Sequence, residues 1–330
     1  AFANFNPHVA LDFHEYRPFR KDFAQLSSFG IANPYDVMFL HTGNLNVPKN
    51  IRTIIDTLFV KNAKKSLDKL NLRHRHYIKS EKYKGEIHFS TGSNTARSSS
   101  NFYALNNGIA TLFEIRGVGI GKTSFKRRIN SGLSVGFSFL KTAYENSIFI
   151  FDEIAKANTY SNVIVLEHQR SIYTDVIKAI DIGSNEMIDF ETTMHSSKDS
   201  YAISKRDRPL AYIIKQNNFG FIEKLKDVGI DYVELQKDTV IYSGGYRVIE
   251  FNDNFKVYEK MRMQKVVTSI EYNDNGFSKG DILISMNQKR SNLIAELLEP
   301  EAPNSYVSFG IINTSLNSQL PIYRIKNLNN

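Results

Sequence analysis

Hydrophobic and polar positions form distinct blocks in the first half of the chain. Residues 9–13 (V-A-L-D-F) are mostly apolar and are followed by His14 and Glu15, which is typical of a buried strand with polar groups at its carboxyl end. Residues 48–70 carry apolar side chains at helical spacing, and Pro48 suits the first helical turn. The pattern therefore predicts a strand followed by an amphipathic helix.

A second strand and a second helix follow. The polar residues 91–101 predict a loop, and residues 110–115 (A-T-L-F-E-I) predict a strand that Gly117 ends. Beyond this glycine, five apolar residues recur at helical spacing: Phe125, Ile129, Leu133, Phe137 and Leu140. The order of strand, helix, strand and helix predicts an α/β layer, a sheet covered by helices.

The pattern changes after residue 155. Short alternating segments at 163–166, 239–242 and 281–285 are separated by Gly, Asn and Asp, and residues 220–228 are a helix candidate. A length of 330 residues is enough for two domains. We predict an α/β domain over residues 1–155 and a β-rich accessory domain over residues 156–330.

Composition narrows the chemistry. The chain contains no Cys, which excludes disulfides, thiolate metal sites and Cys nucleophiles. No window approaches the about 18 uninterrupted apolar residues of a membrane span. The net charge of +8 favours an acidic partner, but the densest basic clusters, 73–76 and 122–128, are short and lack interleaved aromatic residues. We predict no nucleic-acid partner; the oligomeric state is open.

Two residues are candidates for hydrolytic chemistry. His14 and Glu114 each stand at or near the end of a predicted strand, and the carboxyl ends of strands line the ligand crevice of open α/β sheets. Zinc hydrolysis of an amide needs nitrogen and oxygen ligands, an open position for water and a nearby carboxylate. The alternative interpretations are a hydrogen-bonded scaffold role for His14 and an ion pair between Glu114 and either Arg116 or a neighbouring Lys.

The sequence around both residues resembles the zinc carboxypeptidases, the carboxypeptidase A-like metallopeptidases. Residues 6–15 (N-P-H-V-A-L-D-F-H-E) resemble the strand that ends in this family's third zinc ligand, written Asp-x-His. Residues 110–117 (A-T-L-F-E-I-R-G) resemble the strand that carries the general-base Glu, followed by x-Arg. The separation of 114 − 14 = 100 residues lies within the family's range. Segments 117–128 and 297–305 look like bacterial members with a long C-terminal β domain.

The resemblance implies a fold, a reaction and a set of residue roles. The fold would be a mixed sheet covered by helices, and the reaction would be zinc-dependent hydrolysis of terminal peptide or peptide-like bonds, in the periplasm or outside the cell. His14 would bind Zn²⁺, with Asp12 or Glu15 orienting its ring, and Glu114 would be the general base. Substrate contacts would come from three residues: Arg97, Tyr103 and Arg116. Tyr103 could equally be a packing residue, and Arg97, in a Ser-rich loop, fits solvent exposure better than a substrate contact.

The chain also departs from the family. The first two zinc ligands of these enzymes lie in an upstream H-x-x-E motif, which occurs nowhere in this sequence, and the substrate-gripping Arg residues also lie upstream. One protein ligand holds zinc weakly, because zinc sites normally have three or four. The resemblance thus implies an N-terminally truncated fragment that is inactive alone. A sheet without its first strands would also expose an apolar edge.

Two other function classes remain open. Residues 117–124 (G-V-G-I-G-K-T-S) nearly match a phosphate-binding P-loop, and residues 148–153 resemble a Walker B strand, so an NTPase would use Lys122 for phosphate and Asp152 for magnesium. Against this, Arg116 replaces the first Gly, and only 152 − 122 = 30 residues separate the two motifs. The other class is a noncatalytic binding module that uses the strand tyrosines Tyr242, Tyr246 and Tyr272.

Overall fold

A four-stranded mixed sheet forms the centre of the first half of the protein. The computed structural model describes residues 2–157, 161–215 and 219–326. The strand order is β1, β7, β3, β4; β1 is parallel to β7, β7 is antiparallel to β3, and β3 is parallel to β4. The strands are β1 (Val9–Tyr16), β7 (Ile109–Arg116), β3 (Val37–Leu40) and β4 (His74–His76). Both predicted strands are confirmed, and β1 is an edge strand of this sheet within the described residues.

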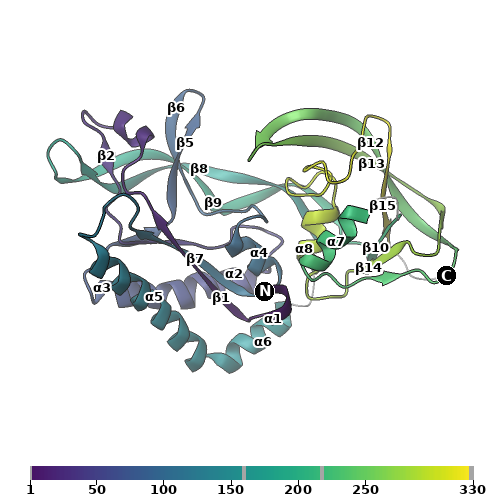
Figure 1. The fold of residues 1–330 in the computed structure, drawn as a ribbon, viewed down its shortest axis with the longest axis horizontal. Helices are drawn as coiled ribbons and strands as arrows, with labels where there is room; N and C mark the ends of the chain where they lie inside the picture. The colour runs from purple at the N-terminus through teal and green to yellow at the C-terminus, as the bar shows by residue number, and fades with distance from the viewer. Residues whose placement is uncertain (1, 158–160, 216–218, 327–330) are drawn as a thin grey trace.

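Helices cover one face of this sheet (Figure 1). Strand alternation places Phe39 and Phe113 on the covered face, where the Phe113 ring lies 5.1 Å from that of Phe139. The predicted helix over 48–70 is continuous but contains one π-helical stretch. The covering segments are α2 (Lys49–Ile54), η2 (Ile55–Val60), α3 (Lys61–Asp68), α5 (Phe125–Glu145) and α6 (Ser147–Ala157).

A five-stranded sheet packs against the other face. Its strands come from both sides of residue 155, in the order β2, β8, β9, β6, β5. Buried residues between the two sheets include Phe23, Met38, Phe89 and Met194. The domain division at residue 155 stays a prediction. The elements are η1 (Lys21–Gln25), β2 (Ile31–Ala32), β5 (Ile78–Tyr83), β6 (Glu86–Thr91), β8 (Val163–Asp181) and β9 (Met187–Asp207).

The C-terminal part is built on a six-stranded sheet, to which the predicted alternating segments at 239–242 and 281–285 belong, whereas the segment at 163–166 lies in β8 of the five-stranded sheet. Figure 1 shows its long hairpin of β12 and β13 arching over the two helices α7 and α8. The strand order is β11, β14, β10, β15, β12, β13. The elements are β10 (Ala211–Ile214), α7 (Phe219–Asp227), β11 (Val233–Glu234), β12 (Thr239–Tyr258), β13 (Met261–Phe277), β14 (Ile282–Ser285), α8 (Ser291–Leu298) and β15 (Gln319–Ile325). The structure is therefore mixed α/β with several sheets.

Two local expectations are wrong. Residues 148–153 lie in α6 and not in a Walker B strand, because Ile150, Ile154 and Ala157 are buried at helical spacing. Asp152 is thus on a helix, and the NTPase interpretation loses the strand that would carry its magnesium ligand. The predicted loop over 91–101 ends early, because α4 (Ser99–Leu105) begins within it. The short helix α1 (Phe2–Phe5) precedes β1.

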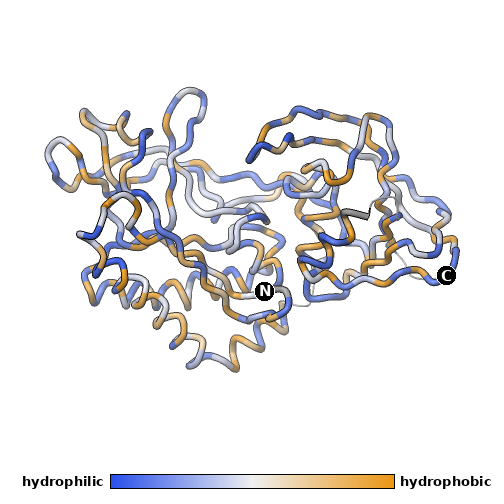
Figure 2. The backbone as a smooth tube through the Cα atoms, viewed as in Figure 1, coloured by the Kyte–Doolittle hydropathy of each residue, from blue (hydrophilic) through white to orange (hydrophobic). Residues whose placement is uncertain are grey.

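Helix α5 forms where the spacing predicts it, but its most apolar face points to solvent. The helix buries Ser131, Val135, Phe139 and Thr142, whereas an amphipathic helix ordinarily buries its apolar stripe. Figure 2 shows hydrophobic residues along α5 and α6 at the outer margin of the molecule. We define the outer apolar face as six α5 side chains that are 44–85% exposed: Phe125, Ile129, Leu133, Phe137, Leu140 and Tyr144.

Among the described residues, no helix is long and apolar enough to cross a bilayer.

Candidate active site

The register of β1 and β7 places His14 directly opposite Glu114. Neighbouring strands lie about 4.8 Å apart, and paired residues project from the same face of a sheet. Their chain neighbours Phe13 and Phe113 also pair, and these two rings stack at 4.9 Å. Phe113 packs into the helix-covered core, so His14 and Glu114 project from the opposite face, towards the five-stranded sheet. Residues one hundred positions apart in the chain thus share one surface.

Asp12, two residues before His14 on β1, contacts the His14 ring. The distance from His14 Nε2 to Asp12 Oδ2 is 3.2 Å, since residues two apart on a strand share a face. Ser99 Oγ, at the start of α4, donates a hydrogen bond of 2.5 Å to the same Asp12 oxygen. The ring remains half exposed. This arrangement fixes the imidazole beside Glu114 while leaving it open to solvent.

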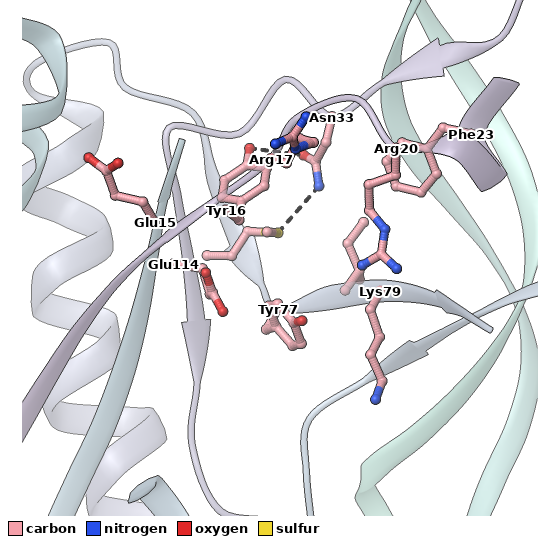
Figure 3. A pocket seen from close by; sticks show the side chains of 11 residues that line it. Glu15, Tyr16, Arg17, Arg20, Phe23, Asn33, Tyr77, Lys79 and Glu114 are labelled. Atoms are coloured by element: carbon pink, nitrogen blue, oxygen red, sulfur yellow. Dashed lines mark hydrogen bonds between the residues drawn. The ribbon is translucent and has the colours of Figure 1, made fainter. Parts of the chain in front are cut away.

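Glu114 lines a cleft of about 360 Å³ between the two sheets. Figure 3 shows its carboxylate on one wall, with Arg20 and Lys79 on the other. Burial raises the pKa of Glu114 above its ordinary value, the nearby Asp12 raises it further, and the charge of His14 opposes both. Among the residues that the structure describes, none donates a hydrogen bond to this carboxylate. A carboxylate with a raised pKa and free oxygens is suited to accept a proton from water.

The three predicted substrate contacts have different surroundings. Arg116 lies on the Glu114 face of β7, and its Nε donates a 3.2 Å hydrogen bond to the carbonyl oxygen of Asn33, a cleft residue. The Arg97 guanidinium lies 3.7 Å from the centre of the Tyr258 ring, in the C-terminal part. Tyr103, on α4, has its ring 5.8 Å from that of Phe102. Neither Arg97 nor Tyr103 lines the Glu114 cleft, and a substrate role for the three residues stays a prediction.

Several cleft residues were missed by the sequence reasoning. Arg17 and Arg20 line the cleft together with Tyr77 and Lys79. The two arginines directly follow β1 in the run R-P-F-R. Because strand ends and the residues after them line ligand crevices, their position was a usable signal. Tyr77 and Lys79 belong to a segment that no apolar pattern marked, and they reach the cleft only through the five-stranded sheet.

Zinc is the metal that the resemblance implies for this site. Within the described part of the chain, His14 pairs with Glu114 across the two strands, and the side chains that line the cleft include no imidazole. A zinc site takes three protein ligands and a water, or four protein ligands. The residues that the structure describes therefore do not complete a zinc site around His14.

A second group of metal-binding side chains lies elsewhere. The ligand atoms of His41, Asp56 and His76 all lie within 4.8 Å of one another. A His/Asp triad of this kind was not predicted, although the run R-H-R-H at residues 73–76 places His74 and His76 on one strand face.

Comparison with curated proteins gives relatives across nearly the whole chain. Over 98% of its length, the chain is 28% identical to carboxypeptidase 2 of Trichophyton equinum, and it covers 61% of that protein. The chain is similar to carboxypeptidases. The values for carboxypeptidase 2 of Trichophyton tonsurans and of Trichophyton rubrum are the same. No protein-family model matches the chain, and no solved structure matches it. The chain spans about three fifths of the length of these carboxypeptidases.

Proposed function

We propose that this chain is part of a zinc-dependent carboxypeptidase that releases amino acids from the ends of peptides. One observation carries the proposal: β1 and β7 pair in a register that sets His14 beside Glu114, and the Glu114 carboxylate lines a cleft. The similarity to carboxypeptidases over 98% of the chain supports the reaction class. The cofactor, the reaction and the residue roles are parts of this proposal.

Glu114 is the general base of the proposed reaction. Its raised pKa brings proton uptake closer to neutral pH, which favours transfer of a proton from water and then to the leaving amine. His14 is a metal ligand, and Asp12 orients its ring. A bound zinc ion would supply an activated water and polarise the scissile carbonyl. This chain contributes one ligand and the base.

Positive charge in the cleft fits the anionic end of a peptide. Arg17, Arg20 and Lys79 line the cleft with Glu114, and Figure 3 shows Arg20 and Lys79 across from the Glu114 carboxylate. A guanidinium can bind a carboxylate with two parallel hydrogen bonds. Arg20 currently pairs only loosely with Asp22, at 3.3 Å, on an exposed surface. We assign Arg20 to the C-terminal carboxylate of the substrate.

The remaining zinc ligands would come from a longer protein that contains this chain. The edge of β1 and the outer apolar face of α5 are both unpaired within the described residues. Six half-exposed side chains of this size present on the order of 600 Å², at the upper end of what a typical monomer exposes in one patch. The curated relatives are longer than this chain. An additional segment that extends the sheet at β1 and covers α5 accounts for both features.

The experiment is a peptidase assay on the longer protein, cloned with the coding sequence on the 5′ side. Glu114→Gln should lower kcat by about 10²–10⁴-fold while zinc content stays unchanged. Glu86→Gln is the matched control, because the Glu86 carboxylate is 80% exposed on β6, and it should retain full activity. Turnover by the Glu114 variant at the rate of the unsubstituted protein would show that Glu114 is not the general base. If the upstream coding sequence has no His and Glu in H-x-x-E spacing, the zinc-dependent part of the proposal is refuted.

The proposed site of action is outside the cytoplasm, in the periplasm or beyond the cell. The family resemblance motivates this placement, and fractionation of the native organism with an antibody against the chain tests it. Detection in the cytoplasmic fraction alone would contradict it.

A further inference from the structure

The carboxyl ends of β3 and β4 carry a cluster that the proposed peptidase chemistry does not use. His41 directly follows β3, and His76 is the last residue of β4. The two strands are parallel, so these ends meet at one edge of the sheet. Asp56 reaches the same place from the π-helical segment η2, a kind of helix distortion that is frequent at functional sites.

We propose that His41, Asp56 and His76 form a binding site for a divalent transition metal ion such as Zn²⁺, separate from His14 and Glu114. Two imidazoles and a carboxylate are ligands that such ions accept. This inference does not depend on the proposed peptidase activity.

The distances between the ligand atoms suit one ion. His41 Nε2 lies 3.4 Å from Asp56 Oδ1, and His76 Nε2 lies 3.7 Å from the same oxygen. Ligands at about 2.0–2.1 Å from a tetrahedral zinc ion are about 3.4 Å apart. The observed separations therefore need only small side-chain adjustments. Asp56 is 38% exposed on its side chain, which leaves a route for the ion from solvent.

His41 supplies an independent sign that a ligand is missing. Its side chain is 4% exposed. Within the described residues neither ring nitrogen makes a hydrogen bond of good geometry, and Nε2 has a 3.4 Å contact with Asp56 Oδ1. A buried polar group that lacks a well-formed hydrogen bond destabilises the fold. The loop that carries His41 packs tightly against β9, and this contact requires a glycine at position 43. A Cβ on Gly43 would lie 2.1 Å from the carbonyl oxygen of Ser197. A metal ion bound to Nε2 would satisfy that nitrogen.

The side chains of His41, Asp56 and His76 have the protonation states that bind a metal ion. Burial and the charges of Lys198 and Lys64 lower the pKa of His76 to about 2, and burial lowers the pKa of His41. The contact with His41, followed by the charge of Lys198, holds the pKa of Asp56 below its usual range. At neutral pH the site therefore presents two neutral imidazoles and an ionised carboxylate.

Two lysine ammonium groups lie beside the ligand atoms, which indicates that the cluster favours a cation. Lys198 Nζ lies 3.0 Å from His76 Nε2 and 3.3 Å from Asp56 Oδ2, and Lys64 Nζ lies 3.1 Å from His76 Nε2. An incoming metal ion must displace Lys198, which shares two of the three ligands. Because the lysine competes with the ion, removing its charge should strengthen metal binding.

The test is zinc binding by the 330-residue chain, free of any affinity tag and stripped with a chelator. Equilibrium dialysis with metal analysis should show one tightly bound equivalent of Zn²⁺. His76→Ala and Asp56→Asn should each weaken binding at least about tenfold, because the loss of even an outer-shell partner of a metal ligand costs about that much. His74→Ala is the matched control, because His74 lies on the same strand but pairs with Asp68 at 2.8 Å. Both His74→Ala and His14→Ala should keep the tight equivalent.

Two further measurements do not rely on destabilising variants. In the unsubstituted chain, Zn²⁺ should shift the NMR signals of the His41 and His76 rings while leaving that of His74 in place. Lys198→Met should bind Zn²⁺ more tightly, a result that a purely structural cluster does not produce. The proposal is overturned if the chain takes up no zinc, if the equivalent follows His14, or if Lys198→Met binds no better. None of these outcomes bears on the peptidase role of Glu114.

Discussion

Phe137 offers the sharpest test of whether a further segment covers α5. Its side chain is 65% exposed, whereas Phe139 on the same helix is fully buried. In this chain, Phe137→Ala removes mostly solvated surface and introduces a better helix former, so the cost should be no more than about 1 kcal/mol. Covering the exposed part, about 130 Å², would contribute about 3 kcal/mol. The same substitution in the longer protein should therefore cost about 3 kcal/mol more.

The assay is urea unfolding of both proteins, each with and without the substitution. The chain contains no Trp, so unfolding is best followed by far-UV circular dichroism, and stability is obtained by linear extrapolation. Phe139→Ala is the matched control, because its ring packs 5.1 Å from that of Phe113 in the core. This control should cost about 3–5 kcal/mol in either length of protein.

An equal cost of Phe137→Ala in the two proteins would refute the reasoning. In that case the outer apolar face stays in water in the longer protein as well. A large cost already in this chain would instead mean that a second copy covers the face, which sedimentation at several concentrations would detect. The control variant separates both results from a general change in stability.

Three further predictions concern the cleft and the C-terminal core. Glu114→Gln should stabilise the chain at about pH 7, because a raised pKa means that the ionised carboxylate is disfavoured in the fold; the gain should vanish below about pH 4, where the carboxyl is protonated in both states. Arg20→Ala should raise KM about tenfold for a peptide in the longer protein, with kcat little changed. Glu299→Ala should cost about 3–5 kcal/mol in thermal unfolding, because Glu299 is fully buried and accepts hydrogen bonds from Tyr246 and Arg206.

Each of these predictions has a clear contrary result. A Glu114→Gln gain that persists at low pH would show that ionisation is not its cause. An unchanged KM for the Arg20 variant, or a loss of kcat alone, would show that Arg20 does not bind the substrate. A neutral Glu299 substitution would mean that Arg206 finds sufficient compensation in Glu301, to which it also donates hydrogen bonds.

Local periodicity explains what the sequence predicts correctly. Strands β1 and β7 and the helices over 49–68 and 125–145 follow from patterns of neighbouring residues. The resemblance to carboxypeptidases, drawn from the segments around His14 and Glu114, is confirmed by the relatives at that coarse level. Zinc, the bacterial type and the noncatalytic module stay predictions. One strand tyrosine of that module, Tyr246, is buried and donates a hydrogen bond to Glu299.

The failures arise where distant segments decide the outcome. The 148–153 run is short and apolar, so its strand or helix state depends on what it packs against. The outward stripe of α5 cannot be recognised from its spacing, because either face satisfies the same period. His41, Asp56 and His76 come from two strand ends and a helix. Only the pairing of β3 with β4 and the packing of η2 bring them together.

The most direct measurement of the central claim joins turnover and metal content in one protein. The longer protein carrying Glu114→Gln should be assayed on an N-blocked peptide with a free C-terminus, beside the Glu86→Gln control, with zinc measured in each sample. The register of His14 and Glu114 predicts full zinc and a loss of turnover of about 10²–10⁴-fold for Glu114→Gln alone. Turnover within about twofold of the control, with zinc bound, would contradict the assignment of Glu114 as the base.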